Sequence, residues 1–176
     1  MKYFDQQNLV LHCSSFSKTL GSGFRMGWVY AGKFSEHIQH LQLMSTISAN
    51  ALIQNVLVEF LSHHHYEKHL RTLRRALEKN KKQFFQYLKQ HLPKDCKVYN
   101  YPSGYFLWIQ LPEKVSSMNI YEQLIQQQIG IAPSPLFNVL HSHQHFIRMN
   151  CSFEWTEQIQ QAVMQFIKAI QNELST

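Results

Sequence analysis

A glycine-rich polar turn between two strand-like runs constrains the fold of this chain more than any other feature. The first run, residues 8–13, is apolar and of strand length, and the second extends from Arg25 to Ala31 and ends at Gly32. The residues that connect the two runs include four serines, a lysine and a pair of glycines. The pattern therefore predicts that Lys18 lies in a polar turn at the end of a strand.

The residue types in this turn indicate a definite chemistry. The hydroxyls of Ser15 and Ser17, backbone N–H groups freed by glycines and the guanidinium of Arg25 are the groups needed to hold a phosphate. A lysine beside that anion, here Lys18, can form an imine with an aldehyde when its surroundings deprotonate the amine. Together these parts describe a pyridoxal 5'-phosphate site. A plain surface turn has a similar composition, and the order of residues excludes a P-loop.

Composition sets the wider limits. The 176 residues suffice for one domain, or for a small domain with part of a second, and 44% hydrophobic content supports a buried core in an α/β chain. No apolar run approaches the roughly 20 residues that cross a bilayer, so we expect no membrane segment. Three cysteines far apart in the sequence favour a reduced, cytoplasmic protein over a disulfide scaffold.

The basic charge is concentrated in one stretch. Seven of the 17 Lys and Arg residues lie between Lys68 and Lys82, where Leu70, Leu73 and Leu77 mark one apolar helix face. The spacing predicts a long amphipathic helix over residues 66–91, with Pro93 after its end. We interpret the cations as a solvated helix face in preference to a DNA contact.

The remaining periodicity predicts a helical stretch followed by a mixed region. Helices are expected from Ser35 and over residues 51–61, before the long basic helix. The following elements are predicted in the order strand, strand, helix, strand, strand, helix: 98–101, 105–111, 119–128 with Gly130 as its cap, 129–132, 146–151, and a last helix opened by Thr156. This order indicates an α+β small domain joined to part of something larger.

The segment from Ser15 to Gly27 resembles the lysine motif of fold-type-I pyridoxal-phosphate enzymes, the class I/II aminotransferases. The resemblance implies that Lys18 is the Schiff-base lysine and that Ser15, Ser17 and Arg25 bind the cofactor phosphate. Residues 102–108 and 131–137 resemble two further motifs of the family, in the same order. Residues 146–151 resemble its strand whose arginine grips the substrate carboxylate, which implies that role for Arg148; a structural salt bridge is the alternative.

A second resemblance concerns the subfamily. Residues 13–20 and 66–74 are similar to the MocR type of GntR transcription regulators, which join an N-terminal DNA-binding domain to an aminotransferase-like effector domain. The resemblance implies a regulator that responds to an amino acid or amine and contacts DNA only through a domain absent from this chain. The alternative is a true aminotransferase that moves an amino group between an amino acid and a 2-oxo acid, and the sequence leaves open whether the parent is an enzyme.

The resemblance also implies a division of the chain. In this family an aspartate and a tyrosine that bind the cofactor ring precede the lysine, whereas only 17 residues precede Lys18 here. We therefore expect a partial fold-type-I transferase that is itself nearly inactive. Residues 1–62 would be the C-terminal end of the large domain, 63–92 a long connecting helix and 93–176 a small C-terminal domain. Family members pair across their active sites, so we expect a homodimer in the full-length parent.

The histidine clusters and Cys13 resemble functional sites, but we predict no metal site and no nucleophile from them. His63, His64 and His65 are consecutive, and His141, His143 and His145 alternate without a carboxylate or cysteine beside them. Neither set has the spacing of zinc ligands, so no metal is expected. Cys13 has no histidine nearby in the sequence to make it a nucleophile.

Overall fold

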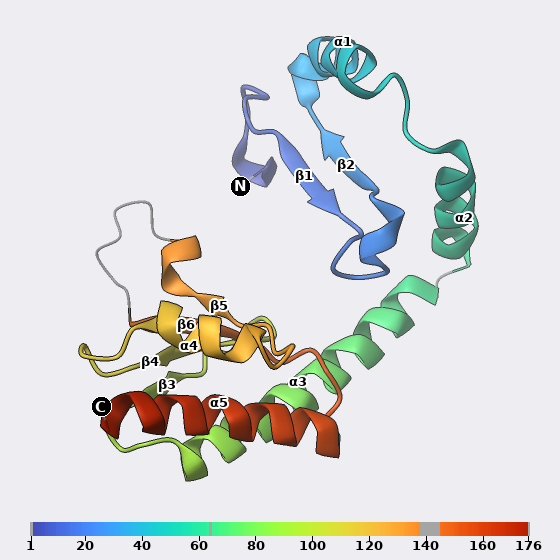
Figure 1. The fold of residues 1–176 in the computed structure, drawn as a ribbon. Helices are drawn as coiled ribbons and strands as arrows, with labels where there is room; N and C mark the ends of the chain where they lie inside the picture. The colour runs from blue at the N-terminus through green and yellow to red at the C-terminus, as the bar shows by residue number, and fades with distance from the viewer. Residues whose placement is uncertain (1, 64, 138–144, 176) are drawn as a thin grey trace. The chain divides into compact units, whose positions relative to one another are not determined.

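The computed structural model describes residues 2–63, 65–137 and 145–175, and the chain divides into two compact units, Met1–Leu73 and Arg74–Thr176 (Figure 1). Helix α3 (His65–His91) begins in the first unit and ends in the second. The change of unit therefore falls inside the long helix. The three-part division at residues 62 and 92 stays a prediction.

The first unit contains a two-stranded antiparallel sheet and helices. Its elements before α3 are η1 (Lys2–Phe4), β1 (His12–Ser15), η2 (Ser22–Phe24), β2 (Gly27–Tyr30), η3 (Gly32–Phe34), α1 (Ser35–Thr46) and α2 (Ala51–Ser62). In the sheet, His12 lies opposite Tyr30 and Ser15 lies opposite Gly27. The polar turn thus joins the two strands of one sheet, at the end where β1 finishes and β2 starts.

Strand β1 begins later than the apolar run predicted, because an aspartate binds the backbone ahead of it. The Asp5 carboxylate accepts hydrogen bonds from the amides of Leu9 at 3.0 Å and Val10 at 2.9 Å, and from the Lys2 ammonium at 2.8 Å. The bond from Lys2, followed by that from Val10, holds the pKa of Asp5 well below its ordinary value. The predicted strand over residues 8–13 was wrong at this end, since the amides of its early residues donate to a side chain.

Much of the apolar surface in the first unit is exposed. Among its described residues, the buried hydrophobic side chains are Ala31 and Leu57, and every position of β1 and β2 is open to solvent. Large apolar side chains such as Trp28 and Leu52 lie at the surface, 43% and 69% exposed. The described part of the first unit thus buries little of its apolar surface.

The second unit contains a four-stranded antiparallel sheet in the order β3-β4-β6-β5. After the end of α3 its elements are β3 (Lys97–Tyr99), β4 (Phe106–Gln110), α4 (Ser117–Ile125), β5 (Ala132–Pro133), η4 (Ser134–Leu136), β6 (Phe146–Asn150) and α5 (Glu157–Ser175). The order of strands and helices agrees with the sequence prediction. The expected α+β arrangement is therefore present in this unit.

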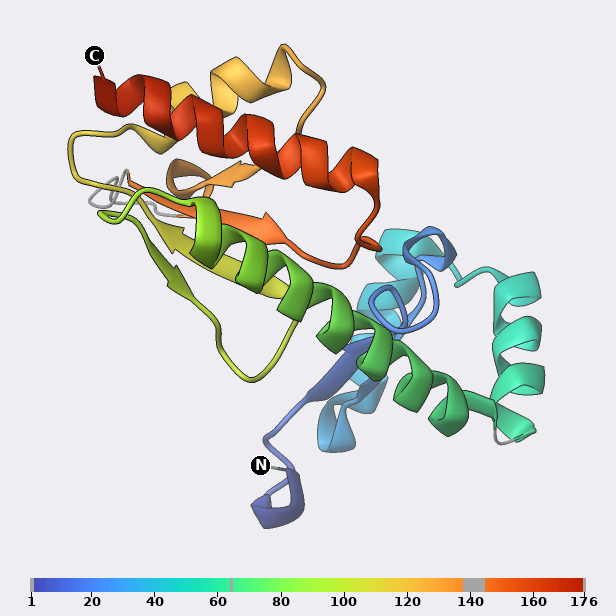
Figure 2. The same cartoon turned by 90° about the horizontal axis from the view of Figure 1, so that it is seen from below.

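One face of this sheet carries the core. Leu107 and Ile109 of β4 and Ile147 of β6 are fully buried, whereas the residues between them are partly exposed, as the alternation of a strand requires. Helix α5 runs along the sheet, with the later part of α3 beside it, in both Figures 1 and 2. Phe84 of α3 and Phe166 of α5 join the same core. The alternate residues of these strands, including Arg148, lie on the opposite face of the sheet.

The segment between α4 and β5 differs from the prediction. Ser116 caps α4 by accepting the Asn119 amide at 3.4 Å, and the helix ends at Ile125 instead of continuing to 128. Gln128, with φ of 61°, takes the left-handed conformation that Gly130 was expected to supply. The predicted glycine cap was therefore wrong.

Lys81 also differs from its expected place on a solvated helix face. It is buried, and its ammonium donates to the carbonyl oxygens of Tyr101 at 2.7 Å, Gly104 at 3.2 Å and Ser103 at 3.3 Å. Three carbonyl acceptors compensate for the removal of the charge from water. The side chain therefore fixes the loop that leads into β4 onto α3.

Replacing this lysine should destabilise the second unit. Lys81→Met leaves three carbonyls without their donor, and we expect the free energy of unfolding to fall by about 1–3 kcal/mol. Urea denaturation followed by far-UV circular dichroism measures the change. Lys82→Met is the matched control, because Lys82 is exposed and should alter stability by less than about 0.5 kcal/mol. Equal stability of the two variants would contradict the role of Lys81.

The three thiols should react in the order of their exposure. Cys13 is exposed, whereas burial raises the pKa of Cys96 to about 11 and that of Cys151 to about 12. Because the thiolate is the reactive form, a raised pKa leaves Cys96 and Cys151 protonated near pH 8. We expect a disulfide reagent at that pH to modify Cys13 first and the other two only at higher pH or after unfolding. Peptide mass mapping of quenched samples gives the order, and early modification of Cys151 would contradict it.

Candidate functional site

The turn that carries Lys18 winds around one backbone carbonyl. The Phe16 oxygen accepts the amides of Leu20 at 2.8 Å, Thr19 at 3.1 Å and Gly21 at 3.2 Å. The Phe16 amide in turn donates to the Met26 carbonyl at 3.0 Å, which extends the pairing of β1 and β2 beyond the strands. Lys18 is exposed on this turn. Its amine is therefore held on a tightly hydrogen-bonded backbone and stays accessible.

Two side chains of α3 anchor the residue that follows Lys18. The Tyr66 hydroxyl donates to Thr19 Oγ1 at 3.1 Å, and His69 Nε2 lies 2.6 Å from the Thr19 carbonyl oxygen, to which it donates as the protonated nitrogen. The Tyr66 ring also meets Phe16 edge-on, with centroids 6.2 Å apart. The sequence predicted a helix here and a subfamily resemblance over residues 66–74, but no contact with the lysine turn. The anchoring contact spans 47 and 50 residues, and no local pattern predicts it.

The two predicted hydroxyls lie at the same end of the sheet. Ser15 is the last residue of β1, and its Oγ accepts the Ser17 amide at 3.3 Å. Gly27 faces Ser15 across the sheet, where a Cβ would lie 2.8 Å from the Ser14 carbonyl oxygen. Only glycine fits such a close approach of two backbones.

Arg25 stands just before β2, at the end of the sheet that also carries Ser15. Its backbone is left-handed, with φ of 49° and ψ of 37°, a conformation that costs a residue with a side chain about 1–3 kcal/mol. Its side chain is exposed and makes no hydrogen bond or ion pair with the described part of the chain. The register of β1 and β2 thus brings Ser15, Ser17, Lys18 and Arg25 to one end of the sheet.

Arg148 belongs to the second unit, on β6. Its guanidinium carbon lies 4.1 Å from the centre of the Phe137 ring and 4.6 Å from that of Phe106. Its Nε is buried and has no hydrogen-bond partner among the described residues. No carboxylate of the described chain forms an ion pair with Arg148, so the alternative of a structural salt bridge gains no support.

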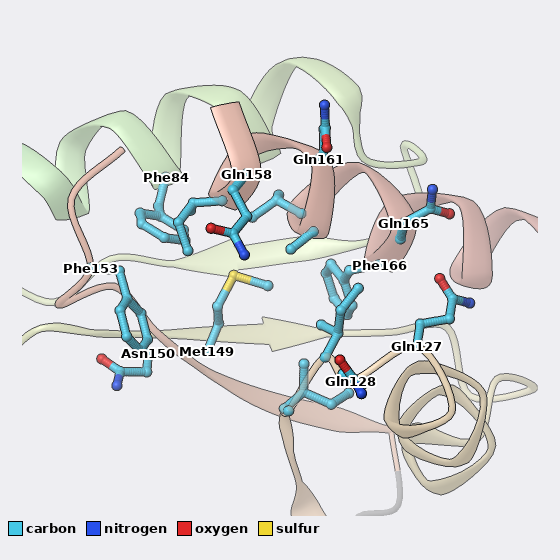
Figure 3. A pocket seen from close by; sticks show the side chains of 16 residues that line it. Phe84, Gln127, Gln128, Met149, Asn150, Phe153, Gln158, Gln161, Gln165 and Phe166 are labelled. Carbon is cyan, nitrogen blue, oxygen red and sulfur yellow. The ribbon is translucent and has the colours of Figure 1, made fainter. Parts of the chain in front are cut away.

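A groove of about 810 Å³ opens on the helix side of the same sheet (Figure 3). Five glutamines contribute amides to its lining: Gln127, Gln128, Gln158, Gln161 and Gln165. Phe84, Met149 and Phe166 add apolar surface, and none of the described residues that line the groove is charged. Because Met149 and Arg148 are consecutive in β6, they point to opposite faces of the sheet. The groove is therefore separate from the Arg148 side chain.

The described residues contain no group of three or more His, Cys, Asp or Glu side chains placed to bind a metal ion. Of the histidines considered as metal ligands in the sequence, His64, His141 and His143 lie outside the described residues. Within the described ranges, no helix combines the length and the apolar character needed to cross a membrane.

A model of the family "Aminotransferase class I and II" matches residues 1–166. The chain belongs to this family. The match includes the lysine turn and the strand of Arg148, so the family predicted from the motifs is confirmed.

Curated relatives place the chain beside transcription regulators. It is 44% identical over 173 residues to the HTH-type transcriptional regulator YdcR of Escherichia coli, and 32% identical over 166 residues to the HTH-type transcriptional regulator NorG of Staphylococcus aureus. The alignments cover 98% and 93% of this chain but 37% of each regulator. The chain therefore spans little more than a third of the length of these relatives. The predicted resemblance to MocR-type regulators is confirmed.

Solved aminotransferases share the fold. The multiple substrate aminotransferase of Thermococcus profundus superposes with a TM-score of 0.87 at 20% identity, over 99% of this chain and 43% of the enzyme. The kynurenine aminotransferase of Pyrococcus horikoshii, solved in complex with PMP, gives 0.87 at 22% identity, over 98% and 43%. The chain thus has part of the fold-type-I aminotransferase fold.

The close approach at Gly27 predicts a selective effect on the lysine turn. Gly27→Ala forces β1 and β2 apart, and we expect the Phe16 amide to exchange with solvent about five-fold faster or more, since enforced backbone shifts cost roughly 1–3 kcal/mol. Amide hydrogen exchange followed by NMR measures this rate. Gly23→Ala is the control, because a Cβ there meets nothing within 4 Å. Unchanged exchange in Gly27→Ala would show that the approach does not constrain the turn.

Proposed function

We propose that this chain is part of a pyridoxal-phosphate-binding effector domain of a MocR-type transcription regulator. The observation that carries the proposal is the lysine turn in a chain that is 44% identical to an HTH-type regulator. In this proposal, residues 1–62 are the end of the large domain, 63–92 the connecting helix and 93–176 the small domain. The full-length parent is a cytoplasmic homodimer that contacts DNA through its HTH segment.

The chain's own residues fit this cofactor. Lys18 offers an accessible amine, which would hold the cofactor through its aldehyde. Ser15 and Ser17 would hold the phosphate through their hydroxyls, and Arg25, which has no partner among the described residues, would supply the matching charge. When bound, pyridoxal phosphate supplies the aldehyde and a ring that withdraws electrons. The strained backbone of Arg25 supports a functional role for that residue.

The ligand in this proposal is an amino acid or amine. Arg148 would bind the carboxylate of an amino acid through two parallel hydrogen bonds. A ligand that binds two states of the parent with different affinity shifts the balance between them, which is how an effector alters DNA binding. The same residues would also serve a true aminotransferase acting on an amino acid and a 2-oxo acid. The regulator relatives favour the effector role.

Covalent labelling tests the lysine. We expect pyridoxal phosphate followed by borohydride to leave a stable adduct on the tryptic peptide that contains Lys18, read by mass spectrometry. Lys18→Ala should abolish this labelling, because the condensing amine is removed. Lys33→Ala is the control, since Lys33 is an exposed lysine of the same unit with no proposed part in the site. Labelling that survives Lys18→Ala, or that spreads over the lysines without preference, would refute the assignment.

The regulatory role has its own test. An in-frame winged-helix segment ahead of Met1 in the genome, together with effector-dependent DNA binding by that longer protein, would support it. Steady transamination by the longer protein without DNA binding would favour the enzyme.

A further inference from the structure

Two aromatic rings contact the Arg148 guanidinium, and we name this pair, Phe106 and Phe137, the aromatic clamp. The guanidinium carbon lies 4.6 Å from the Phe106 centroid and 4.1 Å from the Phe137 centroid, both within the range of cation–π attraction. The two rings come from different elements, since Phe106 opens β4 and Phe137 follows η4. A guanidinium held at two rings has less freedom than one on an extended surface side chain.

The sheet register explains how the clamp forms. Trp108 of β4 lies directly opposite Arg148, so Phe106, two residues earlier, is a diagonal neighbour on the same face. Ala132 of β5 lies opposite Arg148 on the other side, and the chain then turns through η4 to Phe137. The Phe137 amide donates to the Ser134 carbonyl at 2.9 Å, and its ring meets Trp108 edge-on at 6.0 Å. The backbone and the tryptophan therefore hold Phe137 against the arginine.

The clamp leaves the hydrogen-bonding capacity of the arginine unused. Rings attract a guanidinium through its charge but accept no strong hydrogen bonds from its N–H groups. Arg148 Nε is buried without a partner among the described residues, and no described carboxylate pairs with the side chain. A buried donor without an acceptor is unfavourable, and a planar carboxylate is the anion that best satisfies a guanidinium. The arrangement suits a ligand that brings such a group.

We propose that Phe106 and Phe137 are positioning residues, which orient Arg148 for the carboxylate of the ligand. The identification of that ligand as an amino acid rests on the proposed function. The binding of a carboxylate at Arg148 does not, because the clamp lies wholly within the second unit and involves neither Lys18 nor the cofactor.

The test uses the side-chain Nε–H signals of the 176-residue chain labelled with ¹⁵N-arginine. Arg148→Lys assigns the signal of Arg148, which ring currents should shift upfield from those of Arg25, Arg71, Arg74 and Arg75. Titration with sodium acetate at constant ionic strength, against sodium chloride, should move the Arg148 signal to saturation in acetate alone. Propylamine hydrochloride is a further control, because it carries no carboxylate.

Variants of the clamp should weaken this binding. Phe137→Leu removes one ring, and we expect the acetate dissociation constant to rise about five-fold, the magnitude of one cation–π contact. Phe137→Tyr keeps the ring and should behave as the parent chain. Phe153→Leu is the matched control, since Phe153 is an exposed aromatic that lines the groove and is not one of the two rings that contact the Arg148 guanidinium. Phe106→Leu extends the test to the second ring, with the amide spectrum of the core reporting whether the unit stays folded.

The outcomes separate this inference from the proposed function. Absence of an acetate response at Arg148, or equal affinity in Phe137→Leu and Phe153→Leu, would overturn the positioning role while leaving the Lys18 assignment intact. An acetate response at Arg148 that depends on Phe137 would support the clamp. Pyridoxal phosphate labelling that persists in Lys18→Ala would separately reject the cofactor site.

Discussion

The antiparallel pairing of His12–Ser15 with Gly27–Tyr30 is the interaction on which the candidate cofactor site depends. It brings Arg25 to the end of the sheet where Ser15 finishes, although nine residues separate them in the sequence. The bare backbone of Gly27 permits the close approach, and the bonds from Tyr66 and His69 to Thr19 hold the intervening turn. The chemistry proposed for Lys18 thus depends on the backbone pairing that places its turn beside Ser15 and Arg25.

Much of this arrangement follows from residue types in the sequence, and the exceptions have identifiable causes. The candidate site was predicted from the serines, Lys18 and Arg25, because these groups can bind a phosphate and an aldehyde. The long helix was predicted from the helical spacing of its apolar residues. Strand β1 was misplaced because Asp5 binds amides that a strand would use, a competition that hydrophobicity does not report. Lys81 looked like a surface cation because its carbonyl partners follow it by 20 to 23 residues. The ring contacts of Arg148 depend on strand register, which no local pattern fixes.

Similarity to known proteins supports the family and the fold, whereas the roles of individual side chains need further support. The family match and the shared fold account for the order of elements, and the regulator relatives narrow the biological setting. Neither assigns a role to a side chain. The proposed roles rest on the sequence motifs together with three geometric features: a turn wound around the Phe16 carbonyl, a left-handed Arg25 and an arginine held by two rings.

The exposed apolar side chains of the first unit have a consequence for handling the polypeptide. Trp28, Leu52 and Met44, the last of them 84% exposed, make up surface that water solvates poorly. A molecule with such a surface tends to self-associate at high concentration and to occupy chaperones during synthesis. Expression with a solubilising fusion, and storage in dilute solution, are the practical responses to that liability.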